Sequence, residues 1–389
     1  MNKSVLNNNV RFVNENLIEN RYSSTEIHQV LFSEEVFKPH NHDFILNLPG
    51  PQVLVVLSGT INKLYGQIVR EYFESRRGRD AQKFLVIECG EKNKNIETVA
   101  KVCKAATEMN LKRKSVIIGI GGGVCTDICG FASAVYDRGV PHIKVPTTLL
   151  GLVDAGIGIK NGVNFCGRKN NIGSFSHPQL SVLDSTFLLT LDERQLRCGL
   201  AEVIKLATVY DLELFQAVEA NEGRLVKSRM QGSQEESALI LKRAVLGTLE
   251  LLNGDIYETN SYARVLDFGH TFSPNIEVST NHQVLHGEAV AIDIAISSAI
   301  SKKLGVLTEK DFFRLIAVVK KCGLDILHPA IGAGMLLKGL ESIIAHRNGE
   351  LNLVIPAGIG ACEFLRDPKE VNEMLILEAL ELLQGIDNA

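Results

Sequence analysis

The stretch Ser115-Val-Ile-Ile-Gly-Ile-Gly-Gly-Gly-Val-Cys-Thr-Asp127 decides the fold. A short apolar run breaks into three consecutive glycines, Gly121 to Gly123, and an acid follows four residues later. Glycine has no Cβ, so such a turn can adopt positive φ and bring its N–H groups close to a ligand, typically the diphosphate of a nucleotide at a helix N-terminus. The spacing is not the G-x-G-x-x-G of dinucleotide-binding folds, because Val124 stands in place of the third glycine. By itself the turn therefore fits either a phosphate cradle or an ordinary strand-to-helix turn.

Strand-like apolar runs alternate with amphipathic helical segments on both sides of the glycine turn. The predicted strands cover 53–57, 84–88, 115–120, 143–147 and 180–183, and the predicted helices cover 61–76 and 95–110. Continuous apolar strands joined by helices indicate a parallel sheet covered on both faces, which binds ligands at the carboxyl ends of its strands. We therefore expect residues 1–183 to form a doubly wound, nucleotide-binding α/β domain. Within it, residues 1–45 show no clear period and predict an irregular arm or an edge strand.

The pattern changes after Asp184, where long helical periods replace the strands. They cover 193–221, 235–253, 284–304, 310–322 and 369–383, with a further segment around His270. A chain of 389 residues usually divides into two domains, and we place the boundary near residue 183. Residues 184–389 are then a mainly helical domain. The expected fold class is α/β plus α, with a cleft between the two domains.

Bulk composition excludes several classes of function. The chain is 45% hydrophobic and 22% charged, and its formal net charge is −4, so nothing in its charge favours nucleic acid or an anionic membrane as a partner. The N-terminal residues lack the apolar core of a signal peptide, and no apolar run reaches about 18 residues. None of the 8 cysteines forms a C-x-x-C pair, so reduced thiols are expected. The composition predicts a cytoplasmic protein that acts on a small metabolite.

Three potential metal ligands lie far apart in the helical half. Within Gly199-Leu-Ala-Glu-Val-Ile-Lys205, a carboxylate and an ammonium stand three residues apart, on one face of a helix. Two histidines follow, His270 and His286, each next to a glycine that relieves crowding. Together with Glu202 they would form a His2Glu set with room for substrate oxygens, typical of a catalytic rather than a structural zinc site. Taken singly, each histidine is more often an ordinary polar residue.

Residues that can bind anions are unusually dense between the two halves. They are Arg138, Lys144, Thr147, Thr148, Asp154, Lys160, Arg168, Lys169 and Asn170. Lysines and arginines usually form a solvated surface, so the inference depends on their setting. The segment 156–164 is rich in glycine and suggests a loop that closes over a ligand. Glu91 and Lys94 follow a predicted strand, where a doubly wound sheet meets the ribose or phosphates of a nucleotide. A phosphorylated substrate would explain this density.

Seven ordered blocks, taken together, resemble one enzyme family. They are Gly121-Gly-Gly-Val-x-x-Asp127, Val145-Pro-Thr-Thr-Leu-Leu150, Val153-Asp154 followed by Lys160, Lys169-Asn170, Gly199-Leu-Ala-Glu-Val-Ile-Lys205, Phe268-Gly-His-Thr271 and His286-Gly-Glu288. The resemblance, which runs from about residue 50 to the C-terminus, is to the sugar phosphate cyclases of the dehydroquinate synthase superfamily. It implies an NAD-binding α/β domain, a helical metal-binding domain, an active site in the cleft and usually a homodimer.

The resemblance also implies a role for individual residues. Glu202, His270 and His286 would bind Zn2+ or Co2+. The residues implied for NAD are Glu91, Lys94, Gly122, Gly123, Asp127, Thr147, Thr148, Lys160 and Lys169. Those implied around the sugar phosphate are Arg138, Asp154, Asn170, Lys205, Asp267 and His346, of which Asp154, Lys205 and Asp267, with Lys160, would be catalytic.

The chemistry implied by the family is redox-neutral. The metal orients vicinal oxygens of the substrate, and NAD+ oxidises one alcohol to a ketone, which acidifies the neighbouring C–H. Phosphate then leaves by β-elimination, NADH returns the hydride, and an intramolecular aldol addition closes a carbocycle.

Departures from the dehydroquinate synthase pattern indicate a branch of the family. That pattern, Asn-x-Gly-His-Thr-Phe-Gly-His, reads here Asp267-Phe-Gly-His-Thr-Phe-Ser-Pro274. Asp267 would repel the carboxylate of a 3-deoxy-heptulosonate and accept a hydrogen bond from a neutral polyol, while Pro274 cannot transfer a proton. With His346 in place of a usual lysine, these residues resemble the 2-epi-5-epi-valiolone synthases, which cyclise sedoheptulose 7-phosphate. The role of Arg264 stays open at this stage.

Other activities on related folds remain alternatives. Desmethyl-4-deoxygadusol synthase uses the same substrate but also removes water, and 2-deoxy-scyllo-inosose synthase starts from glucose 6-phosphate. 3-Dehydroquinate synthase shares the fold. A metal-dependent polyol dehydrogenase, or a silent NAD-binding protein, would belong to a different class. The sequence does not decide which divalent ion is used, the stereochemistry of the product, the downstream pathway or domain closure.

Overall fold

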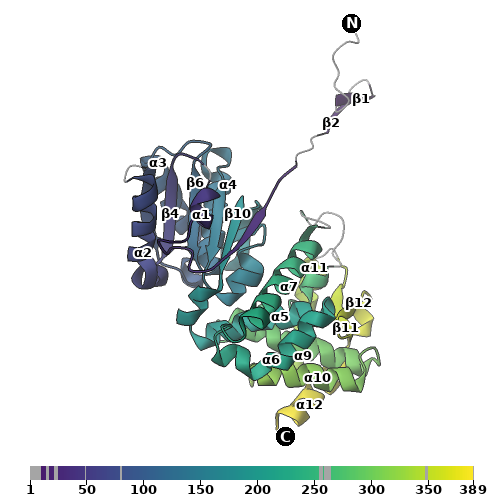
Figure 1. The fold of residues 1–389 in the computed structure, drawn as a ribbon. Coiled ribbons are helices and arrows are strands. Elements are labelled where there is room, and N and C mark those ends of the chain that lie inside the picture. The colour runs from purple at the N-terminus through teal and green to yellow at the C-terminus, as the bar shows by residue number, and fades with distance from the viewer. Residues whose placement is uncertain are drawn as a thin grey trace.

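The computed structural model describes residues 10–14, 17–21, 25–48, 50–78, 81–253, 257, 264–346 and 349–388. The chain forms two lobes (Figure 1), an α/β lobe from the first half and a mainly helical lobe from the second. A hairpin of β1 (Val10–Asn14) and β2 (Leu17–Asn20) projects away from both lobes. The fold class predicted from the sequence is confirmed.

A parallel six-stranded sheet forms the centre of the α/β lobe. Its strands are β3 (Gln29–Ser33), β4 (Val53–Ser58), β5 (Gln82–Ile87), β6 (Val116–Gly121), β7 (His142–Pro146) and β10 (Leu180–Asp184), in the order β3-β10-β7-β6-β4-β5. The four central strands are buried at every position, as their continuous apolar runs predict. The edge strand expected within residues 1–45 is β3, which pairs with β10.

Helices cover both faces of the sheet. Helix α2 (Gly59–Arg77) packs on one face, together with the short α1 (Asp43–Leu46). Helices α3 (Ile96–Glu108) and α4 (Gly123–Val135) pack on the other. From β4 the chain turns outward to β5, whereas β6 leads to β7 on the opposite side, so the connections diverge between β4 and β6. Such a switch point is where open α/β sheets bind ligands.

The glycine turn lies at this switch point, between β6 and α4. None of Gly121, Gly122 and Gly123 has a positive φ, so the left-handed conformation that the sequence allowed is not what requires them. The reason is space, because a Cβ on Gly121 would lie 2.6 Å from the Cβ of Cys125. In the described part of the chain, no side chain caps the first turn of α4, which begins at Gly123. The turn thus places three residues without side chains at the carboxyl end of the sheet.

The segment 156–164, expected to be a loop over a ligand, is instead largely part of a hairpin. A π-helical turn, η4 (Gly151–Ala155), is followed by β8 (Lys160–Phe165), which pairs antiparallel with β9 (Arg168–Phe175). Glycine in this hairpin lets the two strands lie close together, since a Cβ on Gly173 would lie 2.4 Å from the carbonyl oxygen of Asn161. Single-turn π-helices are rare and occur often at functional sites.

The helical lobe contains the remaining elements. They are α5 (Glu193–Val209), α6 (Leu212–Lys227), α7 (Gln234–Asn253), α8 (Ser273–Ser279), α9 (His286–Lys303), α10 (Glu309–Lys321), α11 (Ala333–His346), α12 (Glu373–Asp387) and the hairpin of β11 (Leu353–Gly358) and β12 (Ala361–Leu365). The single helix predicted over 193–221 is wrong, because the chain breaks after Val209 and Asp211 caps a new helix by accepting from the N–H of Leu214. Helix α11 and the β11–β12 hairpin were not predicted. In the described part of the chain, no helix is both long and apolar enough to cross a membrane.

Candidate metal and cofactor site

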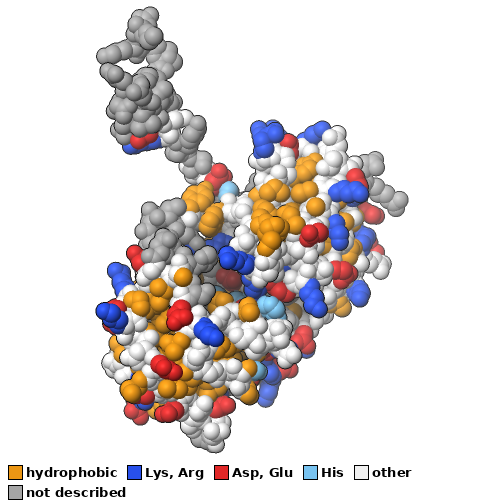
Figure 2. All heavy atoms as spheres, turned by 180° about the vertical axis from the view of Figure 1, so that it is seen from behind, with side chains coloured by type: hydrophobic (Ala, Val, Ile, Leu, Met, Phe, Trp, Pro, Cys, Tyr) orange, Lys and Arg blue, Asp and Glu red, His pale blue; other side chains and the backbone are white. Residues whose placement is uncertain are grey.

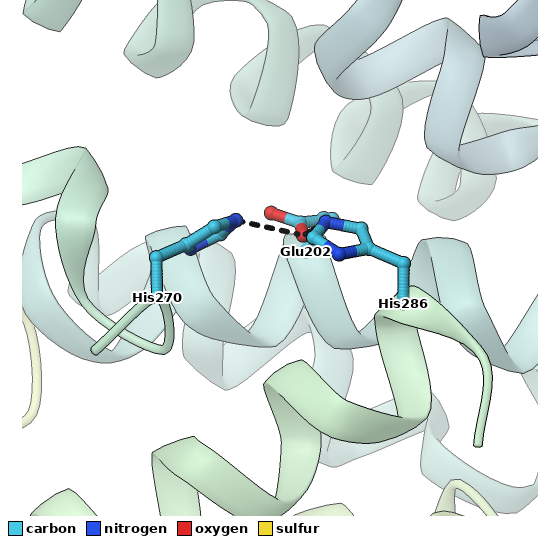
Figure 3. Close-up of side chains that lie close together, drawn as sticks. All are labelled: Glu202, His270 and His286. Atoms are coloured by element: carbon cyan, nitrogen blue, oxygen red, sulfur yellow. Dashed lines mark ion pairs between the residues drawn. The ribbon is translucent and has the colours of Figure 1, made fainter. Parts of the chain in front are cut away.

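Three side chains from separate elements converge in the helical lobe (Figure 3). Glu202 lies on α5, His270 on the loop before α8, and His286 is the first residue of α9. One ligand atom from each lies within 4.8 Å of the others. The Nε2 atoms of His270 and His286 are 3.8 Å and 3.4 Å from Oε1 of Glu202, one on each side of it. The set predicted from the sequence is therefore brought together.

Glycines allow these elements to approach closely. A Cβ on Gly287 would lie 2.3 Å from the Cα of Cys198, so only glycine after His286 lets α9 begin directly against α5. Gly269 has φ +74° and would place a Cβ 3.0 Å from Val290. Its positive φ turns the chain so that His270 faces α5. The glycine beside each histidine thus has a geometric reason.

A buried carboxylate on α9 holds the loop that carries His270. Asp293, which is fully buried, accepts hydrogen bonds from the N–H groups of Phe272 (2.5 Å) and Ser273 (2.9 Å), and from the hydroxyl of Ser297 (3.0 Å). No side chain of α8 itself caps that helix, so Asp293 performs this function from the neighbouring helix. The loop is thereby attached to the helix that begins with His286.

Both histidines are held in the same tautomer. His270 Nδ1 lies 3.1 Å from the carbonyl oxygen of Phe268, and His286 Nδ1 lies 2.9 Å from Oε1 of Glu277. Each acceptor requires a proton on Nδ1, so in the neutral form of each ring the lone pair lies on Nε2, which faces Glu202. This is the arrangement in which two imidazoles serve as metal ligands.

The pKa values of the three potential ligands are strongly shifted. Burial opposes ionisation of Glu202, but Lys205 and the two histidines hold its pKa well below the ordinary value. Burial, reinforced by Lys205, lowers the pKa of His270 to about 4. Burial also tends to lower the pKa of His286, yet hydrogen bonds and charges from Glu202 and Glu277 raise it to about 9. The cluster without an ion therefore contains one imidazole that readily binds a proton and one that does not.

The donor set fits a divalent metal ion. Oε1 of Glu202 is buried and has no hydrogen-bond partner among the residues that the structure describes, an arrangement that is costly unless a cation takes the place of a donor. Two imidazole nitrogens and one carboxylate leave coordination positions for substrate oxygens, as catalytic zinc sites do. Glu202, His270 and His286 could hold such an ion. The ammonium of Lys205, 2.6 Å from Oε2 of Glu202, lies beside it.

Asp154 and Asp267 lie close enough to this cluster to interact electrostatically. Asp154 is part of η4, and burial together with Glu202 raises its pKa. Asp267 contributes to the raised pKa of Lys205, for which burial is the opposing cause and Glu202 and Asp154 the main partners. Arg264, whose role the sequence left open, contacts Oδ2 of Asp267 through Nε (3.1 Å) and Nη2 (3.0 Å).

A polar network surrounds the nucleotide side of the site. Lys94 contacts Asp127 at 2.7 Å and Asn170 at 2.7 Å. The side-chain amide of Asn164 donates to Oε1 of Glu91 at 2.8 Å, and its oxygen accepts from the backbone N–H of Asn170 at 2.9 Å. These residues come from α4, from the loop after β5 and from the β8–β9 hairpin. The structure thus brings together Glu91, Lys94 and Asp127, three of the charged residues predicted for NAD.

Two threonines lie against the glycine turn. The backbone N–H of Thr147 donates to the carbonyl of Gly121 at 2.9 Å. A Cβ on Gly122 would lie 3.1 Å from the side-chain methyl carbon of Thr148, whose hydroxyl accepts from the N–H of Gly151 at 3.1 Å. The glycine turn and the start of η4 therefore lie against each other. The assignment of both threonines to NAD stays a prediction.

Arg138 is not gathered with the other predicted residues. Arg138 follows the C-terminal end of α4, about 20 Å from the glycine turn by helix length, and its side chain is 81% exposed beside Asp137. Within one chain it is not part of the site. Lys160 is exposed at the start of β8, and His346 ends α11, with its side chain outside the described part of the chain.

Sequence reasoning missed one residue and misread another. Glu277, which is only 4% exposed and contacts His286, was not singled out, although it follows the histidine motif at helical spacing. Lys144 was assigned to anion binding but is fully buried, and its ammonium donates to the carbonyls of Ala155 and Gly158 at 2.9 Å each. A lysine within an otherwise apolar buried strand was the available signal.

Seen from the back, the molecule is hollowed between its two lobes, and basic, acidic and histidine side chains gather there (Figure 2). A glycine turn at the switch point of a parallel sheet, together with a His2Glu cluster on a helical lobe, defines a two-lobed enzyme that combines a nucleotide with a metal ion.

Comparison with known proteins agrees with this class. Models of the 3-dehydroquinate synthase N-terminal and C-terminal domains match residues 84–198 and 199–342. A 2-epi-5-epi-valiolone synthase of Streptomyces albus is 36% identical over 362 residues, which cover 90% of this chain and 88% of that protein. A 3-dehydroquinate synthase of Prochlorococcus marinus is 36% identical over 335 residues, which cover 85% of this chain and 89% of that protein.

A solved structure extends the likeness to three dimensions. The 2-epi-5-epi-valiolone synthase of Streptomyces hygroscopicus subsp. jinggangensis, with NAD+ and Zn2+ bound, has a TM-score of 0.87 at 36% identity and covers 94% of this chain and 99% of its own. The chain belongs to the dehydroquinate synthase family of sugar phosphate cyclases.

Proposed function

We propose that the protein converts sedoheptulose 7-phosphate to 2-epi-5-epi-valiolone and phosphate, with NAD and a divalent metal ion, Zn2+ or Co2+, as cofactors. The observation that carries this proposal is Asp267, a carboxylate beside the metal cluster where the dehydroquinate synthase pattern has an amide. The valiolone synthases of Streptomyces albus and Streptomyces hygroscopicus support it by their likeness over most of the chain.

When bound, the cofactors supply transient acceptance of a hydride and polarisation of the vicinal oxygens of the sugar. Residues of the chain then bind the substrate and move its protons. Glu202 and Asp154 stabilise the ammonium form of Lys205, which therefore suits holding a substrate oxygen that gains negative charge. Burial and the neighbouring Glu202 raise the pKa of Asp154, so this carboxyl suits proton exchange with a hydroxyl. Lys160 and Asn170 would complete the substrate site.

Asp267 accounts for the choice of substrate. A carboxylate here repels the carboxylate of a heptulosonate and accepts a hydrogen bond from the hydroxyl of a neutral ketose phosphate. The ion pair with Arg264 holds this side chain in place at 3.0 Å. Pro274 and His346 would contribute to the same choice.

The proposal extends to the organisation of the protein. The domain boundary falls near residue 183, since β10 ends at Asp184 and α5 begins at Glu193. We expect a cytoplasmic homodimer. A partner subunit would also give the exposed Arg138 a site to act on, because this guanidinium does not reach the cluster of its own chain.

A product assay tests the function. Incubation with sedoheptulose 7-phosphate, NAD+ and Co2+ or Zn2+ should release phosphate without net NADH and yield a product lacking the absorbance of a conjugated enone. A strong near-ultraviolet band would instead favour a desmethyl-4-deoxygadusol synthase, and turnover of a 3-deoxy-heptulosonate phosphate would favour a 3-dehydroquinate synthase. Steady accumulation of NADH would favour a polyol dehydrogenase. His270→Ala should abolish both metal binding and phosphate release.

A further inference from the structure

Glu277 is a buried carboxylate with two partners from different parts of the chain. It lies on α8, with Oε1 2.9 Å from Nδ1 of His286 and Oε2 2.5 Å from Nζ of Lys169. Its side chain is 6% exposed, so both interactions are made largely out of water. A carboxylate in such surroundings is ordered by its partners and orders them in return.

The contact with His286 controls the face that this ring presents to a metal. By accepting from Nδ1, Glu277 fixes the proton of the neutral ring on that nitrogen, so Nε2 is the nitrogen that gives up its proton to a metal ion. The other histidine of the cluster, His270, has a backbone carbonyl in the same role. Only His286 thus depends on a side chain for its tautomer, and only this ligand gains the added basicity that a carboxylate partner provides.

The contact with Lys169 reaches the other lobe. Lys169 lies on β9, in the hairpin that packs beside α4, and its ammonium is also 3.9 Å from Oε1 of Glu91. A continuous series of charged side chains therefore runs from Glu91 through Lys169 and Glu277 to His286. Through this series, the hairpin of the α/β lobe touches the metal ligand of the helical lobe.

We infer that Glu277 is a positioning residue for the metal ligand His286, and that Lys169 acts on the metal centre through Glu277. The inference rests on the proposed function, because it assigns a role in holding the metal that the proposed reaction requires. It goes beyond that function by identifying a contact between the two lobes, through which the nucleotide-binding residues are linked to the metal ligands.

Metal affinity measured without turnover tests the first part. Purified, metal-free protein is titrated with Co2+ alone against a chelator, and the visible spectrum of the bound ion is recorded. Glu277→Ala should weaken Co2+ binding by roughly 10–100-fold, the loss typical when the partner of a ligand histidine is removed. Glu277→Gln, nearly isosteric, should show a smaller loss and a changed Co2+ spectrum, because its amide oxygen can still accept from Nδ1. Glu108→Gln, at the surface ion pair with Lys83, is the matched control.

The outcomes separate this inference from the proposed function. If the wild-type chain binds neither Co2+ nor Zn2+, the proposed function fails. If the wild-type chain binds Co2+ and both Glu277 variants bind it with unchanged affinity and spectrum, the proposed function stands and the positioning role is overturned. Thermal unfolding of the metal-free proteins identifies a variant that has not folded, and the Glu277→Gln result then decides.

A double-mutant cycle tests the second part. If Lys169 acts through Glu277, Lys169→Met should lower the Co2+ affinity of the wild-type chain and have no further effect in the Glu277→Gln background. Simple removal of a positive charge would do the opposite, since it favours binding of a cation. An equal factor in both backgrounds, or tighter binding in the wild-type background, would exclude the link.

Discussion

The ammonium of Lys144 lies beneath the π-helical turn that carries Asp154. It donates to the carbonyls of Ala155 and Gly158, the residues directly after and four after the aspartate, at 2.9 Å each. Lys144 is fully buried, and burial lowers its pKa to about 8, although Asp127 and Asp154 counteract the shift. A buried cation used to hold backbone indicates that the conformation of the turn is important enough to offset its desolvation.

Lys144→Met should therefore impair turnover more than stability. The variant leaves two carbonyls without their donor, which costs about 1–3 kcal/mol each, but it also removes a buried charge, and these effects oppose one another. Misplacement of Asp154 by about 1 Å should lower kcat by at least tenfold, and up to roughly a hundredfold. Phosphate release and thermal unfolding measure the two effects, with Lys83→Met at the surface as the control. Unchanged turnover would show that the turn holds its shape without the lysine.

His28 should make the fold sensitive to acid. Its Nε2 lies 2.9 Å from the hydroxyl of Ser181, and burial, reinforced by Lys144 and His177, lowers its pKa from 6.5 to about 4. Because the folded state resists protonation, the unfolded chain binds more protons between pH 6.5 and pH 4, so stability is lost as the pH falls through this window. The loss is at most about 3 kcal/mol, and less for a ring that retains some contact with water.

Denaturant unfolding of metal-free protein at pH 7 and at pH 4.5 checks this prediction. The free energy of unfolding should fall less between the two pH values in His28→Gln than in the wild-type chain. Other carboxylates and histidines titrate in both proteins, so the comparison isolates His28. Equal losses in the two proteins would assign the acid sensitivity elsewhere.

Periodicity revealed most of the fold because the central strands are mainly apolar. Strand β6 and its neighbours are buried on both faces, and such runs have few alternative structures. The β8–β9 hairpin was missed because its residues alternate between polar, glycine and apolar side chains. Helix α6 was merged with α5 because the capping residue Asp211 lies within an otherwise helical period.

Part of the candidate site could be predicted from short motifs rather than from periodicity. Glu202, His270 and His286 stand in motifs whose glycines constrain the backbone, so local sequence carries the signal. Glu277 and Lys144 act through contacts that arise only from tertiary packing. The partner of Glu277, Lys169, is more than 100 residues away in the sequence. The apolar strand around Lys144 is the one local signal, and it does not reveal which groups the lysine contacts.

Gly287→Ala should separate α9 from α5. The added Cβ would lie 2.3 Å from backbone atoms of Cys198, which cannot move without displacing the helix that carries Glu202. We expect a loss of stability of about 1–3 kcal/mol from overpacking and loss of Co2+ binding. Gly385→Ala on α12, where no described residue lies within 4 Å of the new Cβ, is the control, and it should be neutral or slightly stabilising. A Gly287→Ala protein that binds Co2+ normally would contradict the packing argument.

Asp267→Asn tests whether the carboxylate selects the substrate. The variant keeps the shape of the side chain but weakens the ion pair with Arg264, and it removes the acceptor charge offered to a neutral sugar. The kcat/KM for sedoheptulose 7-phosphate should fall by roughly 10–100-fold, because a charged hydrogen bond contributes about 1.5–3 kcal/mol. Co2+ affinity should stay within about threefold of the wild-type value, since Asp267 is not one of the three ligands. Steady-state phosphate release and Co2+ titration measure both quantities. Equal kcat/KM values for the two proteins would move the choice of substrate to Pro274 and His346.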